Sequence, residues 1–461
     1  MMKIFKTTTM IVASALLLGA CATEPGGFEA NQIANSQITD TPDYWEAVAA
    51  QAGPVKNGWL NTFNDPTLTK LVVEAQANNR NLRAASAEVE QAWAFARLAG
   101  AELSPQVGLG VSGSSIGVID GQSFENARIG LQASWELDVW GRIRSGQQAA
   151  SASAEAAVAD HRFAQMSLAA AVARAYFIAV EAERQRQVAD AIVKSLKETD
   201  ELVKFRSENG LASEQDLALS RANLANARDT VVSIDAAKRN ALRALEVLIG
   251  RYPSAEIELK STLPDVPGAP PAGIPSEILE RRPDLLAAER RIAASIDNVD
   301  QAKAARLPRI SLSSNLGGST SDLNGLLSPS NFFWTAAANL LVPVIDGGAL
   351  KTQVDISKAE QKAAVETYAQ AALRAFQEVE TALDSGVTLR KRRKLVEEAK
   401  TQSEKALSLT MLQYQVGETD LLTVLQIQNR VFQAQSNALS VNRLQLEQFV
   451  DLNLALGGDW N

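Results

Sequence analysis

Few residues in this chain could carry out catalysis or hold a metal ion. His161 is the only histidine among 461 residues, and it lies in the polar run Ala-Asp-His-Arg at positions 159–162. For this imidazole we expect a solvated position on a helix, rather than the role of a general base or a metal ligand. No Gly-Lys pair occurs, so the chain lacks a phosphate-binding P-loop. We therefore expect no enzymatic activity, no metal site and no cofactor.

The single cysteine indicates a different chemistry, the attachment of lipid. Lysines near the N-terminus precede an apolar run from Met10 to Leu18, which is the layout of a secretory signal peptide over residues 1–20. The next residue, Cys21, has no second cysteine with which to form a disulfide. The sequence Leu-Gly-Ala-Cys that ends there is similar to the lipobox of bacterial lipoproteins, whose cysteine becomes the acylated first residue. The alternative is an ordinary leader with an incidental cysteine.

The position after the cysteine predicts the membrane in which the anchor would lie. Ala22 stands there, and not the Asp that usually retains a lipoprotein in the inner membrane. Several acyl chains are needed for stable anchoring, and a lipoprotein cysteine acquires more than one. We therefore expect a lipid-anchored protein of the outer membrane that extends into the periplasm.

The composition is typical of long packed helices. The net charge of −8 and the isoelectric point of about 5.1 argue against nucleic acid as a partner. Aromatic residues make up only 5% of the chain, while Ala, Leu, Gln and Glu are abundant. Beyond the leader, the best candidate for a membrane helix, residues 163–180, is interrupted by Gln165 and Arg174. Any membrane crossing should therefore be made by strands.

The chain contains the same arrangement twice, at an offset of about 203 to 207 residues. Asn81-Leu82-Arg83-Ala84-Ala85 corresponds to Asp284-Leu285-Leu286-Ala287-Ala288, and the run at 103–107 corresponds to that at 306–310. The predicted segments are a lipidated extended segment at 21–60, a first repeat at 61–250, a Pro-rich linker at 251–275, a second repeat at 276–457 and a tail at 458–461.

Each repeat should contain two strands. Ile129, Leu131, Ala133 and Trp135 alternate with polar residues, which is the period of two of a strand with unlike faces. The expected strands cover about 104–113, 126–140, 308–317 and 332–345. Their length suits a tilted strand that crosses a bilayer. A soluble half-buried sheet has the same periodicity, and the lipoprotein leader favours the membrane alternative.

Long helices should follow each strand pair, at 141–208 and 213–250 in the first repeat and at 347–416 and 419–456 in the second. Apolar residues spaced by seven, such as Leu425, Phe432, Leu439 and Leu446, predict antiparallel coiled-coil hairpins. The expected fold is mainly α, with four strands per subunit. Because four strands cannot close a barrel in lipid, the protein must assemble from two, three or four subunits.

The junctions between strands and helices carry the most specific resemblance. The first junction reads Trp-Glu-Leu-Asp-Val-Trp-Gly-Arg-Ile-Arg at 135–144, and the second reads Val-Pro-Val-Ile-Asp-Gly-Gly at 342–348. Both are similar to the paired motifs of the TolC-like outer-membrane efflux family, in its NodT-type lipoprotein branch. The motifs at 65–68 and 281–285 also match. The resemblance implies a homotrimer with a twelve-stranded barrel and a helical tunnel, which docks to a periplasmic adaptor of an inner-membrane pump.

The resemblance also implies roles for the hairpin ends. The adaptor-contacting tips correspond to Gly210, Leu211, Ser213, Asp216, Gly417, Thr419 and Asp420. The periplasmic gate corresponds to Tyr414, Asp420, Leu422 and Gln426. Relatives commonly have an acidic residue where this chain has Gln426, and an arginine where it has Asn429, so a gate narrowed by Leu422 and polar Gln426 is expected.

Three functions remain open on this basis. The chain could be a passive efflux conduit for small toxic compounds such as drugs or metal ions, an outer-membrane component of type I protein secretion, or a periplasmic coiled-coil scaffold without a pore. The lipoprotein branch favours efflux.

Overall fold

The computed structural model describes residues 26–36, 42–47, 53–117, 123–321 and 325–460. The predicted signal peptide and Cys21 lie outside the described residues. Two compact units are formed, each from separate parts of the chain. The first comprises residues 1–39, 87–160 and 284–371, and the second comprises residues 40–86, 161–283 and 372–461.

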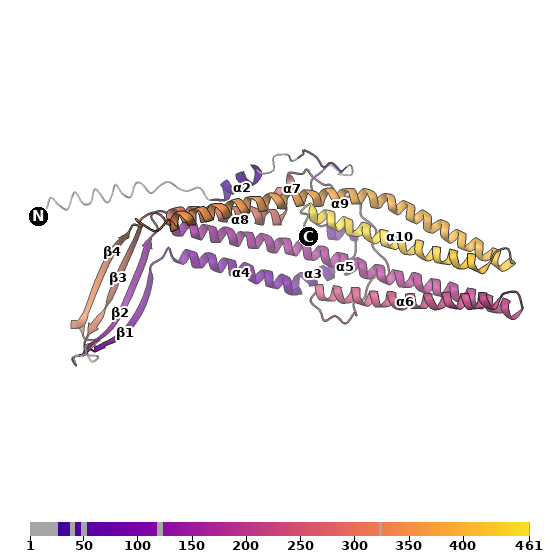
Figure 1. Cartoon of the computed structure of the whole chain (residues 1–461), viewed down its shortest axis with the longest axis horizontal. Coiled ribbons are helices and arrows are strands. Elements are labelled where there is room, and N and C mark those ends of the chain that lie inside the picture. Colours follow the sequence, from indigo (N-terminus) through magenta and orange to yellow (C-terminus); the bar gives the residue numbers. More distant parts are fainter. Residues whose placement is uncertain (1–25, 37–41, 48–52, 118–122, 322–324, 461) are drawn as a thin grey trace. The chain divides into compact units, whose positions relative to one another are not determined.

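The chain order of the elements, visible in Figure 1, repeats a helix, strand, strand, long helix and returning helix. The bounds are α2 Gly26–Ser36, η1 Trp59–Phe63, α3 Pro66–Asn78, α4 Arg80–Ala101, β1 Gln106–Gly117, β2 Ser123–Leu137, α5 Arg142–Glu208, α6 Glu214–Leu248, α7 Glu277–Arg281, α8 Pro283–Ala304, β3 Arg309–Thr320, η3 Pro329–Asn331, β4 Phe332–Leu341, α9 Ala349–Val416 and α10 Leu421–Ala455. The mainly helical fold with four strands is confirmed.

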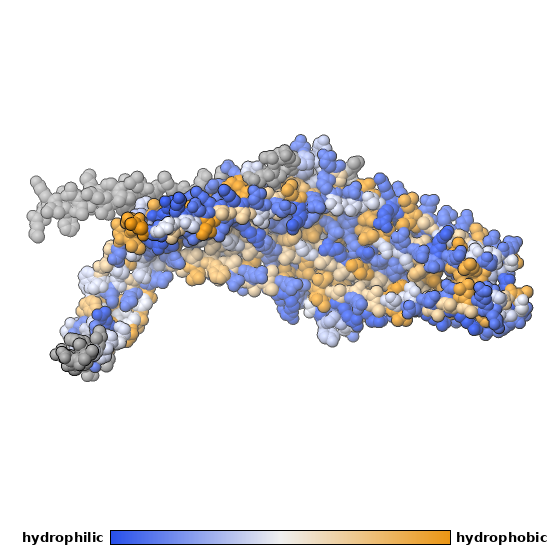
Figure 2. All heavy atoms as spheres, viewed as in Figure 1, coloured by the Kyte–Doolittle hydropathy of each residue, from blue (hydrophilic) through white to orange (hydrophobic). Residues whose placement is uncertain are grey.

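The first unit contains a four-stranded antiparallel sheet of order β1-β2-β3-β4. Leu131 faces Leu109 on β1 and Leu316 on β3, and Leu316 in turn faces Trp334 on β4. Because directly opposed residues share a face, these side chains form one apolar face. The neighbours of Leu131, Gly130 and Gln132, lie on the opposite face. Apolar residues at the surface of the strands appear orange in Figure 2.

The sheet has two open edges within the described chain, β1 and β4, because each pairs with only one neighbour. The outer side of such an edge strand leaves backbone N–H and C=O groups without partners. Every residue of β4 is exposed, including Trp334 at 75% and Leu340 at 65%. Within the described residues, no strand pairs with the outer side of β1 or β4, and β4 is exposed along its whole length.

The second unit is held together by an aromatic and aliphatic core. Phe63 of η1 lies between Phe177 of α5 and Phe449 of α10, with ring centroids 5.2 and 5.4 Å away. Asp65 caps α3 by accepting hydrogen bonds from the N–H groups of Thr67 and Leu68, and it also accepts one from the hydroxyl of Tyr176. The motif at 65–68 is thus a helix start that is tied to the core.

Three predictions are corrected by the structure. The N-terminal segment expected to be extended contains the helix α2. The fourth strand ends at Leu341 rather than 345, because Pro343 has no N–H for the ladder. The second strand ends at Leu137 rather than 140, where Asp138 and Gly141 begin the turn into α5.

One part of α5 is apolar enough to resemble a membrane helix, although the sequence led us to expect no such helix beyond the leader. An 18-residue window of this helix has a mean hydropathy of 1.5, enough by length and composition to cross a membrane, and half of that window is buried in the protein. Ala169, Ala173 and Phe177 of α5 belong to the core of the second unit. Packing of a core helix accounts for this hydropathy.

Candidate functional site

The turn of the first helical hairpin is built by a glycine and a capping box. Gly210, at φ +72°, lies in the left-handed region that a side chain rarely adopts. Ser213 then caps α6: its hydroxyl oxygen accepts a hydrogen bond from the N–H of Asp216, and the Asp216 carboxylate accepts one from the N–H of Ser213. Leu211, between these residues, is 66% exposed. Of the predicted tip residues of this hairpin, Leu211 is thus the apolar side chain presented to solvent.

The turn of the second hairpin is also formed by a glycine and a capping residue. Gly417 has a φ of +84°, and the N–H of Glu418 donates to the carbonyl of Gln413 over 2.9 Å, which closes α9. Asp420 begins α10 by accepting a hydrogen bond of 2.7 Å from the N–H of Thr423. This hydrogen bond lowers the pKa of the Asp420 carboxyl below its usual value. Asp420 therefore has a structural role as a cap.

Tyr414 lies inside the protein, just before this turn. Only 4% of it is exposed, and it packs in a cluster with Leu196, Leu224 and Val424. The guanidinium of Arg206 lies 4.9 Å above the Tyr414 ring and donates a hydrogen bond of 2.7 Å to the Tyr414 carbonyl. Burial raises the pKa of the Tyr414 phenol, and the Arg206 charge acts in the opposite direction. Tyr414 thus links the ends of the two hairpins.

Leu422 and Gln426 lie on the opposite face of α10 from this cluster. Both are exposed, Leu422 at 54%, and Asn429 continues the same exposed face, since these positions are spaced by four and three residues. Leu421, Val424 and Leu425 are buried against the neighbouring helices. The four predicted gate residues are therefore divided: two share an exposed face, Asp420 caps the helix, and Tyr414 is in the interior.

Arg206 was not predicted from the sequence as a residue of the hairpin ends. It is a basic residue in the last turn of α5, where a positive charge interacts favourably with the helix dipole. A basic residue at the end of a long predicted helix was visible in the sequence. The contact of Arg206 with Tyr414, however, joins residues 208 positions apart. Only the tertiary structure reveals this contact.

The strand-to-helix motifs form two equivalent turns in the first unit. The Asp138 carboxylate accepts hydrogen bonds of 2.9 Å from the N–H groups of Ile143 and Arg144. In the second repeat, the Asp346 carboxylate accepts bonds of the same length from the N–H groups of Gly348 and Leu350. In both turns an Asp satisfies the free N–H groups at the start of a long helix. These motifs have a structural role, because each one begins the long helix that follows a strand in the chain.

No group of three or more His, Cys, Asp or Glu residues that could hold a metal ion occurs within the described residues. His161 lies within α5 and is half-buried.

A chain with four long antiparallel strands, an exposed apolar sheet face and two long helical hairpins belongs to the class of outer-membrane channel subunits. The comparison with known families agrees, since the family described as outer membrane efflux protein matches residues 71–251 and 274–458. The chain is a member of this outer-membrane efflux family, which consists of channel proteins rather than enzymes.

Several relatives resemble the chain over most of its length. It is 31% identical to the pyoverdine export outer membrane protein OpmQ of Pseudomonas aeruginosa, over 98% of this chain and 96% of the relative. It is 30% identical to the cation efflux system protein CusC of Escherichia coli, over 87% of this chain and 88% of the relative. Among solved structures, the outer-membrane channel OprN has a TM-score of 0.85 at 28% identity, covering 92% of this chain and 97% of that chain. The open state of the MtrE outer membrane channel of Neisseria gonorrhoeae has a TM-score of 0.83 at 29% identity, covering 92% of this chain and 96% of that chain.

Proposed function

We propose that three copies of the chain assemble into one channel that carries small toxic compounds across the outer membrane. The two open edges of the sheet are the observation on which this proposal rests. A single four-stranded sheet is too small for a membrane barrel, the smallest of which have about eight strands. Pairing β4 of one copy with β1 of the next would leave no free edge in lipid.

The cargo depends on the pump rather than on this chain. Relatives are named for the export of pyoverdine, of toluene and of cations, so the same fold serves unlike small molecules. We propose that the chain is a passive conduit for drugs or metal ions, supplied by a periplasmic adaptor and an inner-membrane pump.

The conduit is tested by recording currents from the purified full-length protein in planar lipid bilayers. A channel gives discrete conductance steps, and the unheated protein migrates on gels as a trimer that heating dissociates. A scaffold without a pore gives neither result. Repeated absence of conductance from protein that is shown to be trimeric would overturn the proposal.

We propose that the hairpin ends contact the adaptor. Helix capping already uses the polar groups of Ser213, Asp216 and Asp420. Leu211, in contrast, is apolar and exposed to solvent. The adaptor that copurifies with the chain would also identify the pump. Loss of this copurification in Leu211→Asp, with the trimer intact, would support the contact; an undiminished yield of adaptor would exclude Leu211 from it.

The exposed face of α10 is the proposed gate. Replacing both Leu422 and Gln426 with alanine shortens two side chains that lie on one exposed helix face, so the single-channel conductance is expected to rise. The matched control is Gln435→Ala, because Gln435 lies on the same helix but donates its hydrogen bond to Glu404 within the protein. An unchanged conductance of the double variant would place the constriction elsewhere.

We propose that Cys21 carries the lipid anchor. Cys21→Ala is expected to lose all incorporation of radiolabelled palmitate, because no other cysteine is available. Each buried methylene of an acyl chain contributes about 0.8 kcal/mol to membrane binding. The membrane fraction of the variant should nevertheless retain protein if the barrel forms. Palmitate label that persists in the variant would show acylation at another site.

A further inference from the structure

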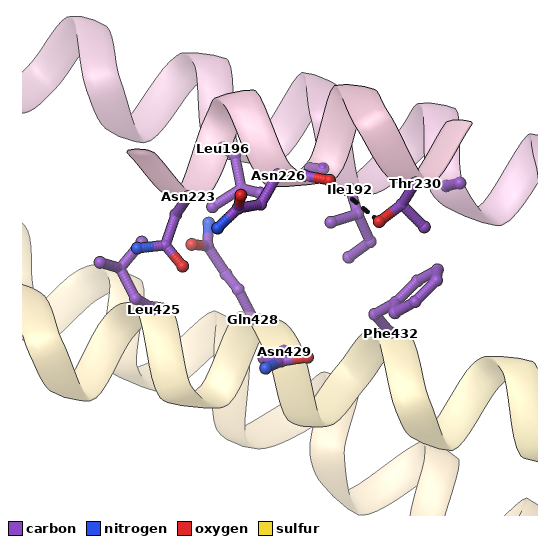
Figure 3. Close-up of a pocket in the computed structure, with 11 residues that line it drawn as sticks. Ile192, Leu196, Asn223, Asn226, Thr230, Leu425, Gln428, Asn429 and Phe432 are labelled. Carbon is purple, nitrogen blue, oxygen red and sulfur yellow. Dashed lines mark hydrogen bonds between the residues drawn. The ribbon is translucent and has the colours of Figure 1, made fainter. Parts of the chain in front are cut away.

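The residues that share the exposed face of α10, where the gate is proposed, are neutral. They are Leu422, Gln426 and Asn429. Asn429 also borders a cavity between α5, α6 and α10, and the eleven residues that line this cavity, shown in Figure 3, are all uncharged. None of these positions can select a permeating molecule by its charge. Such selection requires fixed charges at other positions of the conduit.

The polar face of the sheet carries fixed charges of this kind. Gln132 lies on this face, and so do Arg128 and Glu136, because every second residue of a strand points to the same side. Glu136 faces Ser311 on β3, which places Arg309, two residues earlier, on the same face. The strands β1 to β4 contain only one other charged residue, at position 125 on the opposite face.

The one carboxylate of the polar face is neutralised by its own chain. Arg142, the first residue of α5, donates two hydrogen bonds of 3.1 Å to the two carboxylate oxygens of Glu136. This two-pronged geometry is the strong form of an arginine–carboxylate pair. The next carboxylate along the chain, that of Asp138, is bound by the N–H groups that begin α5 and by the guanidinium of Arg144. Neither carboxylate is free to offset a further positive charge.

The two arginines of this face have no such partner. Arg128 and Arg309 are exposed, and neither makes a hydrogen bond or an ion pair with a described residue. Arg128 faces Ser112 on β1 and Ser319 on β3, so its neighbours across the sheet are neutral. Arg309 faces Leu341 on β4. The polar face of each copy therefore carries two positive charges that the described residues do not compensate.

We propose that Arg128 and Arg309 line the lumen of the barrel and select anions, so that the cargo of this channel is a small organic anion. The inference rests on the proposed function, because the polar face of the sheet must enclose the lumen. Rings of arginine or lysine side chains line pores that pass anions, and a guanidinium matches the geometry of carboxylate and phosphate groups. A free metal cation would be repelled at both positions.

The two arginines act at different depths of the barrel. Arg128 lies in the half of β2 that is nearer the hairpin between β1 and β2, whereas Arg309 is the first residue of β3, next to the end of α8. A molecule that passes through the barrel would meet one ring of guanidinium groups and then the other. Both rings attract an anion, so neither end of the barrel favours a cation.

The experiment measures the chloride-to-potassium permeability ratio of single channels of the purified full-length protein in a gradient of potassium chloride. The wild type is expected to prefer chloride. Changing Arg128→Gln and Arg309→Gln together should lower the ratio about threefold or more, because a potential of about one kT changes the local concentration of an ion by that factor. With potassium benzoate in place of the chloride salt, the same variant should lose preference for the organic anion.

Three further variants separate the effect of charge from damage to the barrel. Arg128→Lys keeps the positive charge and should keep the preference for chloride. Each single glutamine variant should lose part of the preference, which supplies the comparison if the double variant assembles poorly. Glu125→Gln is the matched control, because it changes the charge of the same strand by one unit on the opposite face, and its permeability ratio should equal that of the wild type.

Two outcomes would overturn the proposal. A wild-type channel that prefers potassium would exclude anions as the class of cargo. An equal permeability ratio in the wild type and the arginine variants, with the trimer intact on unheated gels, would show that these side chains do not line the conduction path. In both cases the conductance steps themselves would still support the proposed channel. Complete absence of current from trimeric protein would overturn the channel and this inference together.

Discussion

Replacing Arg206 with alanine is expected to raise the open probability of the channel about tenfold. The Arg206 guanidinium donates to the Tyr414 carbonyl and stacks on the Tyr414 ring, and both contacts require the ends of the two hairpins to be together. A hydrogen bond from a charged donor contributes about 1.5 kcal/mol or more, and about 1.4 kcal/mol corresponds to a tenfold change in an equilibrium. Loss of the contact therefore favours separation of the hairpin ends.

The measurement is single-channel recording, with two further variants for comparison. Arg206→Lys keeps the charge but not the planar group that stacks on Tyr414, so an intermediate open probability is expected. Arg221→Ala removes an exposed arginine of α6 that has no partner among the described residues, and it should behave as the wild type. An unchanged open probability in Arg206→Ala, with the trimer intact on gels, would show that this contact does not hold the channel closed.

The periodicity of the sequence was sufficient to predict the main elements. Alternation of apolar and polar residues identified the strands, because a sheet with unlike faces requires it, and the register places Leu109, Leu131 and Leu316 on one face. The spacing of Leu425 and Leu446 predicted packed returning helices, and both are buried. Strand ends were less accurate, since they depend on local turn geometry at Pro343 and Asp138.

The candidate site was less predictable than the fold. Residues on both sides of the second turn were assigned one role, although they belong to different helices and different faces. Tyr414, near the end of α9, is buried, whereas Leu422, at the start of α10, is exposed. Contacts between α5 and α10, such as that of Gln428 with Thr199, join residues 229 positions apart and leave no periodic signal in the sequence.

The two faces of β2 provide the sharpest test of the membrane assignment. Leu131 and Gln132 are neighbours in the middle of this strand, but they point to opposite faces of the sheet. If the apolar face meets lipid, arginine at position 131 has to lose water near the middle of the bilayer. That change should cost about 2–4 kcal/mol. Arginine at position 132 would point to the polar face, where a water-filled lumen accommodates the charge.

Leu131→Arg is therefore expected to reduce the amount of heat-modifiable trimer in the outer membrane strongly, whereas Gln132→Arg should leave it near the wild-type amount. The Gln132→Arg channel should also show altered ion selectivity, because the new charge would line the conduction path. Both variants introduce arginine, at positions next to each other in the same strand. Differences in expression or helix packing therefore cannot explain a difference in the amount of trimer between them. Equal assembly of the two would mean that the apolar face of the sheet is covered by protein rather than lipid, and the barrel would then need a different arrangement of subunits.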